Sequence, residues 1–247
     1  MEELLWILGS VIVVSLISLV GVVTLSLTDN VLKKLLFLLV AFSAGAMLGG
    51  AFIHLLPEAL EKSSSLFVFL FVLVGFSLFF ILEKLLFWRH CHEGKCHIHT
   101  FTYMNLMGDA VHNFIDGMII AATYLVSIPL GIITTVAIIA HEIPQEISDF
   151  GVLVYGGFKK TKALFANFMV ALTAVLGAIF GYLLSSSIEG SNSFLIPFAA
   201  GGFIYIAASD LVPELHKEKD IKKSYVSFIV FLLGILLMWI TKIVLGG

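Results

Sequence analysis

Long apolar runs separated by short polar stretches dominate this chain. A helix that crosses a bilayer needs about 20 predominantly apolar residues, and eight runs come close to or exceed that length. They predict spanning helices over residues 4–27, 34–57, 66–87, 101–124, 128–157, 162–184, 194–213 and 225–245. The pattern therefore predicts an all-α polytopic membrane protein with eight transmembrane helices, in which a single transmembrane domain covers residues 1–247.

Lysine and arginine are unevenly distributed over the connections between these runs. With eight spanning helices, 12 of the 14 Lys and Arg residues belong to the connections 1–2, 3–4, 5–6 and 7–8. Only Lys62 and Lys242 lie on the opposite side. Because cytoplasmic connections carry an excess of Lys and Arg, we expect an even number of spans with both termini extracytoplasmic.

The composition agrees with a chain that is covered largely by lipid. Hydrophobic residues make up 60% of the 247 residues and charged residues only 13%, with a mean hydropathy of +1.07. An ordinary soluble domain is about half apolar and about a quarter charged. The net charge is −3 and no long basic tract is present, so nucleic acid is not expected as a partner. Glu2 and Glu3 precede the first run, where a secretory signal would carry positive charge, so we expect a retained membrane helix.

Two of the runs carry polar residues at helical spacing. Residues three and four apart lie on one face of a helix. In the fourth run this face holds Asp109, His112, Asn113 and Asp116. The fifth run carries a second set at similar spacing: His141, Glu142, Gln145, Glu146 and Asp149.

Five of these nine side chains are carboxylic acids, and neither segment contains Lys or Arg. An acid at the bilayer centre costs about 3 kcal/mol on insertion scales, so intramembrane acids are functional candidates. A bound cation, a water-filled cavity or protonation must compensate for the burial. The alternative is a buried polar network that only joins helices. Imidazole and carboxylate ligands favour Zn²⁺, Fe²⁺, Mn²⁺ or Cd²⁺ over Na⁺ or K⁺, and Glu142 is a candidate to bridge two metal positions.

Pro144 and several small residues bear on how these helices pack. Pro144 lacks a backbone donor and should free the carbonyl of Ala140, either at a metal site or at a simple kink. Small residues spaced by four allow close approach of helices in lipid. They recur at Ala41, Gly45 and Gly49 in the second run and at Gly177 and Gly181 in the sixth.

Further polar residues lie in the second and seventh runs. His54 and Glu58 are four residues apart and fit either a way-station at the outer mouth or an interfacial contact. Met47 lies deeper, as a soft thioether ligand or as packing. Asp210 and Glu214 lie near the predicted cytoplasmic side, as exit residues or as a solvated helix end.

A histidine-rich stretch fills the predicted cytoplasmic loop at 88–100. Its candidate ligands are His90, Cys91, His92, Cys96, His97 and His99. The composition is typical of metal binding, and the setting favours metal over a disulfide for the two cysteines. The spacing does not match a zinc finger, so we expect a loop that captures or senses metal; an incidental histidine cluster is the alternative.

The motifs HNFIDG at 112–117 and HEIPQE at 141–146 resemble the ZIP (Zrt/Irt-like) family of divalent metal transporters. The segments AFIHLLPEAL and SDLVPEL and the histidine-bearing loop also resemble it. The resemblance implies eight transmembrane helices with both termini outside, and metal import toward the cytoplasm through a binuclear site on helices four and five. It also implies a homodimer and an elevator-like movement of a four-helix transport bundle.

Carried over by motif position, the resemblance also implies a ligand set. It comprises His112, Asn113, Asp116, His141, Glu142 and Gln145, with Glu146 adjoining and Met47 beside the site. The related subfamily pattern has histidine where this chain has Gln145, and an amide oxygen is a weaker and harder ligand than imidazole. Zinc is the expected substrate from the resemblance, and Gln145 leaves room for iron or manganese; the ligand types also admit cadmium.

Together these observations predict a multi-pass cell-membrane transporter of zinc and not an enzyme. One alternative is an intramembrane metalloprotease, because HEIPQ shares part of the H-E-x-x-H zinc signature. Gln145 removes the second histidine of that signature, and Pro144 disturbs its helix. The pattern is also compatible with a membrane metal sensor that does not transport, and with a passive metal channel.

Overall fold

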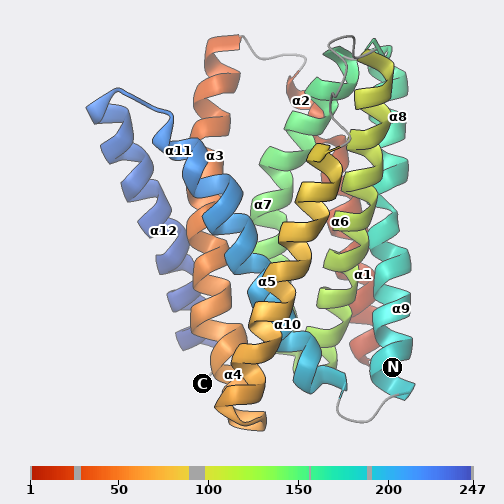
Figure 1. Ribbon diagram of the computed structural model, residues 1–247, viewed down its shortest axis with the longest axis vertical. Helices are drawn as coiled ribbons and strands as arrows, with labels where there is room; N and C mark the ends of the chain where they lie inside the picture. Colours follow the sequence, from red (N-terminus) through yellow and green to blue (C-terminus); the bar gives the residue numbers. More distant parts are fainter. Residues whose placement is uncertain (1, 25–28, 89–97, 156, 188–190, 246–247) are drawn as a thin grey trace.

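The computed structural model describes residues 2–24, 29–88, 98–155, 157–187 and 191–245, which form a bundle of long helices (Figure 1). This described part of the chain is helical and contains no strand. The helices are α1 (Glu2–Ile17), η1 (Ser18–Val20), α2 (Gly21–Thr24), α3 (Asp29–Gly49), η2 (Gly50–Leu55), α4 (Leu56–Lys62), α5 (Ser65–Trp88), α6 (Ile98–Val126), α7 (Ile128–Tyr155), α8 (Lys160–Ala171), α9 (Thr173–Ser187), α10 (Ser191–Tyr205), η3 (Ile206–Leu211), α11 (Val212–His216) and α12 (Ile221–Leu245).

Several of these segments continue one another, and together they follow the eight predicted runs. Seven stretches of the described chain are long and apolar enough to cross a membrane. The helix α6 is not among them, because its polar face lowers its mean hydropathy, although it runs beside α7 and α9 through the bundle (Figure 1). The all-α polytopic fold is thus confirmed, whereas the count of eight spans stays a prediction.

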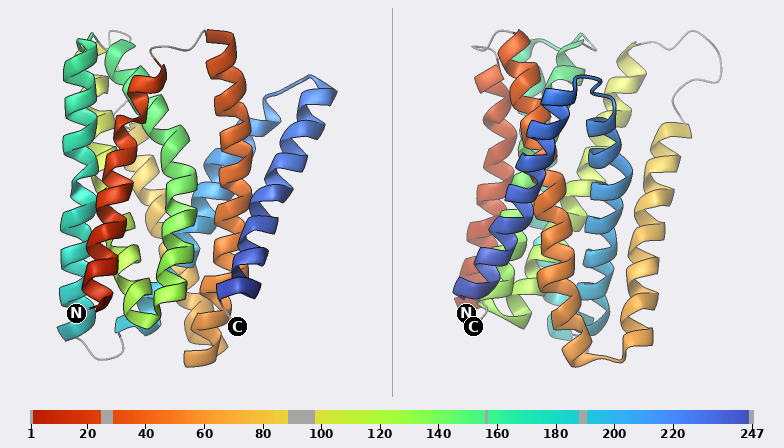
Figure 2. Two further views of the ribbon diagram at one scale, coloured as in Figure 1. Left: turned by 180° about the vertical axis from the view of Figure 1, so that it is seen from behind. Right: turned by 90° about the vertical axis from the view of Figure 1, so that its left-hand side faces the viewer.

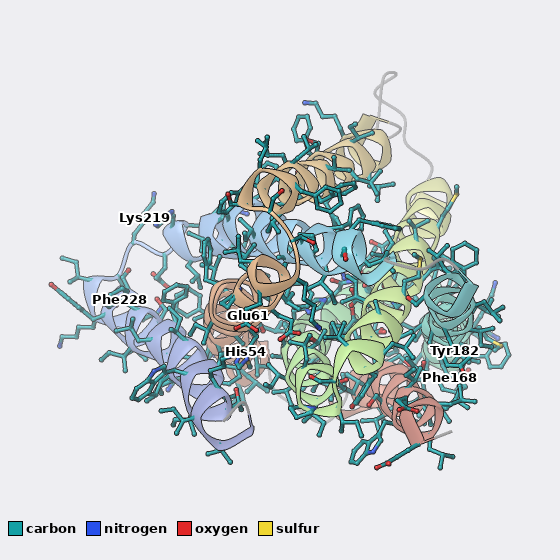
Figure 3. All side chains as sticks on the ribbon, turned by 90° about the horizontal axis from the view of Figure 1, so that it is seen from below. His54, Glu61, Phe168, Tyr182, Lys219 and Phe228 are labelled. Carbon is teal, nitrogen blue, oxygen red and sulfur yellow. The ribbon has the colours of Figure 1, made fainter. Side chains whose placement is uncertain are left out.

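The helices divide into an inner and an outer set. Only 17% of the most apolar stretch is buried in each of α5 and α12, against 61% in α7 and 65% in the span formed by α10, η3 and α11. Side chains such as that of Phe228 on α12 point outward (Figure 3). The polar residues of α7 therefore sit inside the bundle, away from the surface that lipid would cover.

Both ends of the described chain lie at the same end of the bundle. The start of α1 and the end of α12 are close in height in both views of Figure 2. An even number of crossings requires this arrangement. Which side of the membrane they face stays a prediction.

Two spans contain a wide helical turn in front of a proline. The π-helical segments η2 and η3 are followed within two residues by Pro57 and Pro213. Proline cannot donate a hydrogen bond to the preceding turn, and wide turns of this kind recur at such interruptions and at functional sites. The apolar pattern alone gave no sign of them.

Glycine brings three pairs of helices into backbone contact. A Cβ atom at Gly45 would lie 1.9 Å from the carbonyl oxygen of Phe231, which joins α3 to α12. The same argument joins α5 to α10 at Gly75 and α6 to α9 at Gly117, with Cβ separations of 2.1 and 1.9 Å from backbone oxygens. The small-residue spacing therefore serves close packing.

The loop predicted at 88–100 is shorter in the structure. The helix α6 begins at Ile98, three residues before the predicted start of that span, and α5 ends at Trp88. Of the candidate loop ligands, His90, Cys91, His92, Cys96 and His97 lie outside the described residues, as does the side chain of His99.

Candidate metal-binding site

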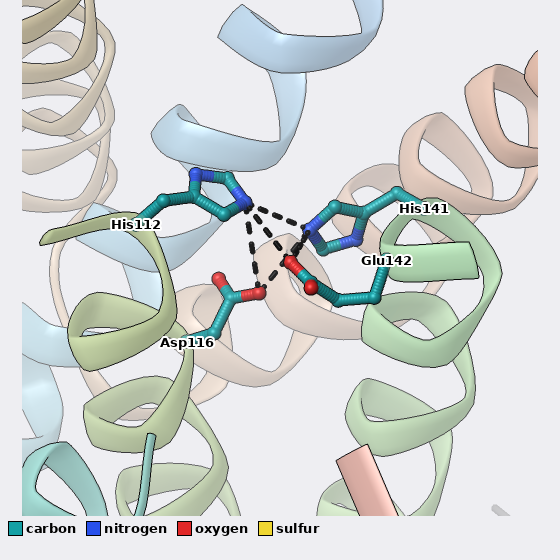
Figure 4. A group of neighbouring side chains, drawn as sticks. All are labelled: His112, Asp116, His141 and Glu142. Atoms are coloured by element: carbon teal, nitrogen blue, oxygen red, sulfur yellow. Dashed lines mark hydrogen bonds and ion pairs between the residues drawn. The ribbon is translucent and has the colours of Figure 1, made fainter. Parts of the chain in front are cut away.

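Four largely buried side chains from two neighbouring helices converge on one another (Figure 4). His112 and Asp116 lie one turn apart on α6, and His141 and Glu142 are adjacent on α7. One potential ligand atom of each residue lies within 4.8 Å of the other three. We call these four residues the His/carboxylate cluster.

The separations within the His/carboxylate cluster are short. His112 Nε2 lies 3.1 Å from His141 Nε2 and 3.3 Å from Glu142 Oε1. His141 Nε2 lies 3.1 Å from Asp116 Oδ2 and 3.5 Å from Glu142 Oε1. His112 and Asp116 are further apart, at 3.8 Å. Ligand atoms on a tetrahedron around zinc stand about 3.4 Å apart when the metal–ligand distance is about 2.1 Å. The separations in the cluster lie on both sides of this value.

The two acids of the cluster are deeply buried and accept no hydrogen bond from the described residues. Glu142 is 0% exposed and Asp116 1%. No donor of the described residues meets their four carboxylate oxygens in hydrogen-bond geometry, although His112 Nε2 lies 3.3 Å from Glu142 Oε1 and His141 Nε2 lies 3.1 Å from Asp116 Oδ2, so that either acid forms an ion pair when the facing imidazole is protonated. An ionised carboxylate buried without compensation is costly. The arrangement therefore suits a cation held between the two helices.

The imidazole of His141 is oriented by its own helix. Its Nδ1 atom lies 3.2 Å from the carbonyl oxygen of Ala137, and a carbonyl can only accept, so the proton belongs on Nδ1. Nε2 is then left with a lone pair that faces the cluster. Phe79 on α5 and Phe203 on α10 place their rings against His112 and His141, each with centroids 6.2 Å apart. These aromatic rings form an apolar wall beside the polar centre.

A second polar layer follows, nearer the start of α6 and the end of α7. We call it the carboxamide layer, because in it each acid accepts a hydrogen bond from a side-chain amide. Asp109 Oδ1 accepts from Asn113 Nδ2 at 2.8 Å and from Gln145 Nε2 at 3.2 Å. Asp149 Oδ1 accepts from Asn105 Nδ2 at 2.9 Å, and Glu146 Oε2 accepts from Asn167 Nδ2.

A family model described as ZIP Zinc transporter matches residues 3–98 and 88–242 of the chain, which together span nearly all of it. The chain belongs to the ZIP zinc transporter family. The resemblance drawn from the HNFIDG and HEIPQE motifs is therefore confirmed.

Three relatives illustrate the similarity of this ZIP family member to proteins of other organisms. Zinc transporter ZIP13 of Pongo abelii is 35% identical over 217 residues, with 81% of this chain and 65% of the relative covered. Zinc transporter zipt-7.1 of Caenorhabditis briggsae is 30% identical, with coverages of 84% and 71%. The ZIP13 homolog of Drosophila melanogaster is 31% identical, with 83% and 77% covered. The chain thus spans about two thirds to three quarters of the length of these relatives, and each of them is named a transporter.

Two asparagines in this ZIP protein were not among the predicted site residues. Asn105 lies four residues before Asp109 on α6, so the spacing that selected the other four residues could have included it. Asn167 lies on α8 and is 0% exposed. A single asparagine in an apolar span was the only signal available for it.

Pro144 of the ZIP protein has the predicted effect on the backbone, and a partner compensates for it. The carbonyl of Ala140, four residues earlier, accepts a hydrogen bond from the hydroxyl of Ser43 on α3. Ser43 also bonds the Leu39 carbonyl of its own helix at 2.7 Å. A side chain of a third helix therefore stabilises the interrupted turn that carries His141.

Other predicted site residues have contacts of their own in the described part of the chain. Gln145, at the place of the second histidine in H-E-x-x-H, donates to Asp109 instead. Met47, on α3, is fully buried in the apolar core of the bundle. His54 faces α12, with Nε2 2.7 Å from the carbonyl oxygen of Met238, which fits an interfacial contact (Figure 3). Glu58 pairs with Lys62 at 2.6 Å. The side chain of Asp210 lies outside the described residues.

Proposed function

We propose that this ZIP protein moves a divalent metal ion, zinc, across its membrane through the His/carboxylate cluster. The main support for this proposal is a pair of buried carboxylates, Asp116 and Glu142. They face two imidazoles and accept no hydrogen bond within the described chain. The relatives named as zinc transporters support the choice of ion.

The charge and the donor atoms of the cluster support the same ion. With both histidines neutral, the two carboxylates carry a charge of −2, which a single divalent cation balances. Two nitrogen and two oxygen donors suit zinc, and iron, manganese and cadmium are secondary candidates. The cluster contains no thiolate, so the ion would be held less tightly and released more readily than at a structural cysteine site.

A second metal position in the carboxamide layer is part of the proposal. Four buried oxygens there have no hydrogen-bond partner in the described part of the chain: Asp109 Oδ2, Asn113 Oδ1, Glu146 Oε1 and Asn167 Oδ1. Carboxylate and amide oxygens are harder donors than imidazole. We infer a weaker site there, next to the first, through which metal passes.

We infer import toward the cytoplasm by alternating access. The lysine-rich connections support the orientation, and the helix pairs joined at glycine support movement of helices as rigid units. An elevator-like shift, a homodimer and a location in the cell membrane are carried over from the family resemblance and complete the proposal.

Zinc uptake into proteoliposomes, followed with an entrapped zinc-sensitive dye, tests the proposal. We expect His112→Ala and Glu142→Ala each to reduce uptake by more than about tenfold, because each removes a donor atom from the cluster. His216→Ala, which removes an exposed histidine of α11, is the matched control and should transport normally. Wild-type uptake in either cluster variant would contradict the proposal.

The same assay separates transport from sensing and from channel activity, and a peptide-cleavage assay on the purified protein separates it from proteolysis. A sensor would bind zinc without accumulating it in sealed vesicles. A channel would give a flux that does not saturate with metal concentration. A protease would cleave peptides regardless of whether vesicles are sealed.

A further inference from the structure

The helices α3 and α12 touch at mid-height and diverge toward one end of the bundle (Figures 1 and 2). Their contact is fixed by glycine, since a Cβ atom at Gly45 would clash with Phe231 and one at Gly234 would clash with Phe42. Toward the start of both helices the chains separate and leave a groove of about 740 Å³. That volume lies in the range of small-molecule sites.

The residues that line the groove change from charged at its mouth to apolar further along the two helices. Lys34 of α3 and Lys222 and Lys223 of α12 lie at the mouth, where both spans begin. Phe37, Leu38 and Val226 line it one turn deeper. An amphiphile with an anionic head and an apolar tail matches this gradient, whereas a small soluble anion would use only the mouth.

Charge at the mouth is positive overall. Among the described lining residues Glu218 is the one acid, and the backbone N–H of Asp220 donates to it at 2.9 Å, which lowers the pKa of the Glu218 carboxyl. The ionised Glu218 pairs with Lys223 at 3.3 Å. Lys34 and Lys222 have no acidic partner among the described residues.

The first N–H groups of α12 do not supply the anion site themselves. Asp220 Oδ1 accepts hydrogen bonds from the backbone N–H groups of Lys222 and Lys223, at 2.8 and 3.3 Å. Binding of an anion would therefore rest on the lysine side chains.

We propose that this groove binds an anionic phospholipid, with the headgroup phosphate between Lys34 and Lys222 and an acyl chain along Phe37, Leu38 and Val226. The groove lies at the lysine-rich end of the bundle, the end predicted to face the cytoplasm. That leaflet carries the anionic lipids, and basic pockets between transmembrane helices bind their headgroups. The bound lipid would fill the space between α3 and α12 where glycine no longer holds them together.

Native mass spectrometry of the purified full chain in detergent tests the lipid site. Phosphatidylglycerol should bind on the order of tenfold more tightly than phosphatidylcholine. The double variant K34Q/K222Q should lose most of that difference. K159Q/K160Q, which removes two exposed lysines at the start of α8 on the same side of the bundle, is the matched control and should keep it.

Soluble glycerol phosphate distinguishes a lipid site from a site for free phosphate groups, and it should not displace phosphatidylglycerol at millimolar concentration. The lipid site is ruled out if the two lipids bind equally, if both double variants lose the same affinity, or if glycerol phosphate competes fully. Zinc uptake plays no part in these measurements, so their outcome is independent of the transport proposal.

Discussion

The two polar layers between α6 and α7 differ in how their acids are compensated. In the His/carboxylate cluster, Asp116 and Glu142 accept no hydrogen bond from the described residues. In the carboxamide layer, Asp109, Glu146 and Asp149 each accept at least one from a side-chain amide. The layers use the same two helices at neighbouring depths, so burial alone does not separate them. What separates them is whether the protein itself supplies a donor.

Because of this difference, we expect the two layers to differ in stability when no metal is bound. An acid with an amide donor keeps part of its hydrogen bonding without metal. An acid without one is compensated only by a neighbouring proton or by a cation. We therefore expect the His/carboxylate cluster to be the part of the bundle that is least stable without metal and most stabilised by it.

The largest expected effect comes from Glu142→Gln. The change removes one negative charge from the cluster and leaves a neutral amide oxygen, a weaker donor, in place of the carboxylate, so zinc affinity should fall about 100-fold or more. The metal-free protein should become more stable, because a buried charge that accepts no hydrogen bond from the described residues is removed. Zinc titration by calorimetry and thermal unfolding in detergent measure the two effects.

The control for Glu142→Gln is Glu58→Gln, which removes a carboxylate outside the cluster that pairs with Lys62. It should leave zinc affinity unchanged. A metal-free Glu142→Gln protein that is less stable than the parent would show that the acid is compensated without metal, and the comparison between the layers would be wrong.

Glu146→Gln probes the carboxamide layer with the same chemical change. The neutral amide cannot offer the charged acceptor that Asn167 now has, so the free energy of unfolding without metal should fall by about 1 to 2 kcal/mol. Zinc affinity should fall only a few fold, because the acid lies outside the cluster. Thermal unfolding and calorimetry again provide the measurements, and a loss of affinity equal to that of Glu142→Gln would make the two layers one site.

Gln145→His tests how the carboxamide layer affects metal choice. The change removes a hydrogen-bond donor from Asp109 and introduces an imidazole, which zinc accepts more readily than manganese does. We expect the ratio of zinc to manganese uptake to rise by a few fold. Gln145→Asn, which keeps the amide but shortens its reach, should not raise that ratio, and competition between the two metals in proteoliposomes measures it.

Sequence spacing predicted part of this site because helical periodicity is local. Asp109, His112, Asn113 and Asp116 share one face of α6 wherever that helix lies in space. The apolar runs likewise predicted the bundle, and the same polar face explains why α6 falls short of the apolarity of a spanning helix.

Contacts that depend on packing between distant segments could not be predicted in the same way. Asn167 reaches Glu146 only because α8 lies against α7, and His54 meets Met238 only because glycine brings α3 against α12. The turn of Gln145 toward Asp109 is a choice of side-chain conformation, on which spacing carries no information.

Ser43→Ala should have the smallest effect of these changes. It alters a contact that supports the backbone beside the cluster and leaves the cluster residues unchanged. The hydroxyl of Ser43 satisfies the Ala140 carbonyl that Pro144 leaves without a partner. Its removal should lower the free energy of unfolding by about 1 kcal/mol. It should also weaken zinc binding slightly, because His141 is the next residue after Ala140.

The matched control is Ser227→Ala, which removes a buried hydroxyl that donates within its own helix α12, to the carbonyl of Ser224 at 2.9 Å. It should cost a similar free energy of unfolding and leave zinc affinity unchanged. If both variants weaken zinc binding equally, the contact between Ser43 and Ala140 has no specific part in holding the cluster, and the interrupted turn of α7 is held by packing alone.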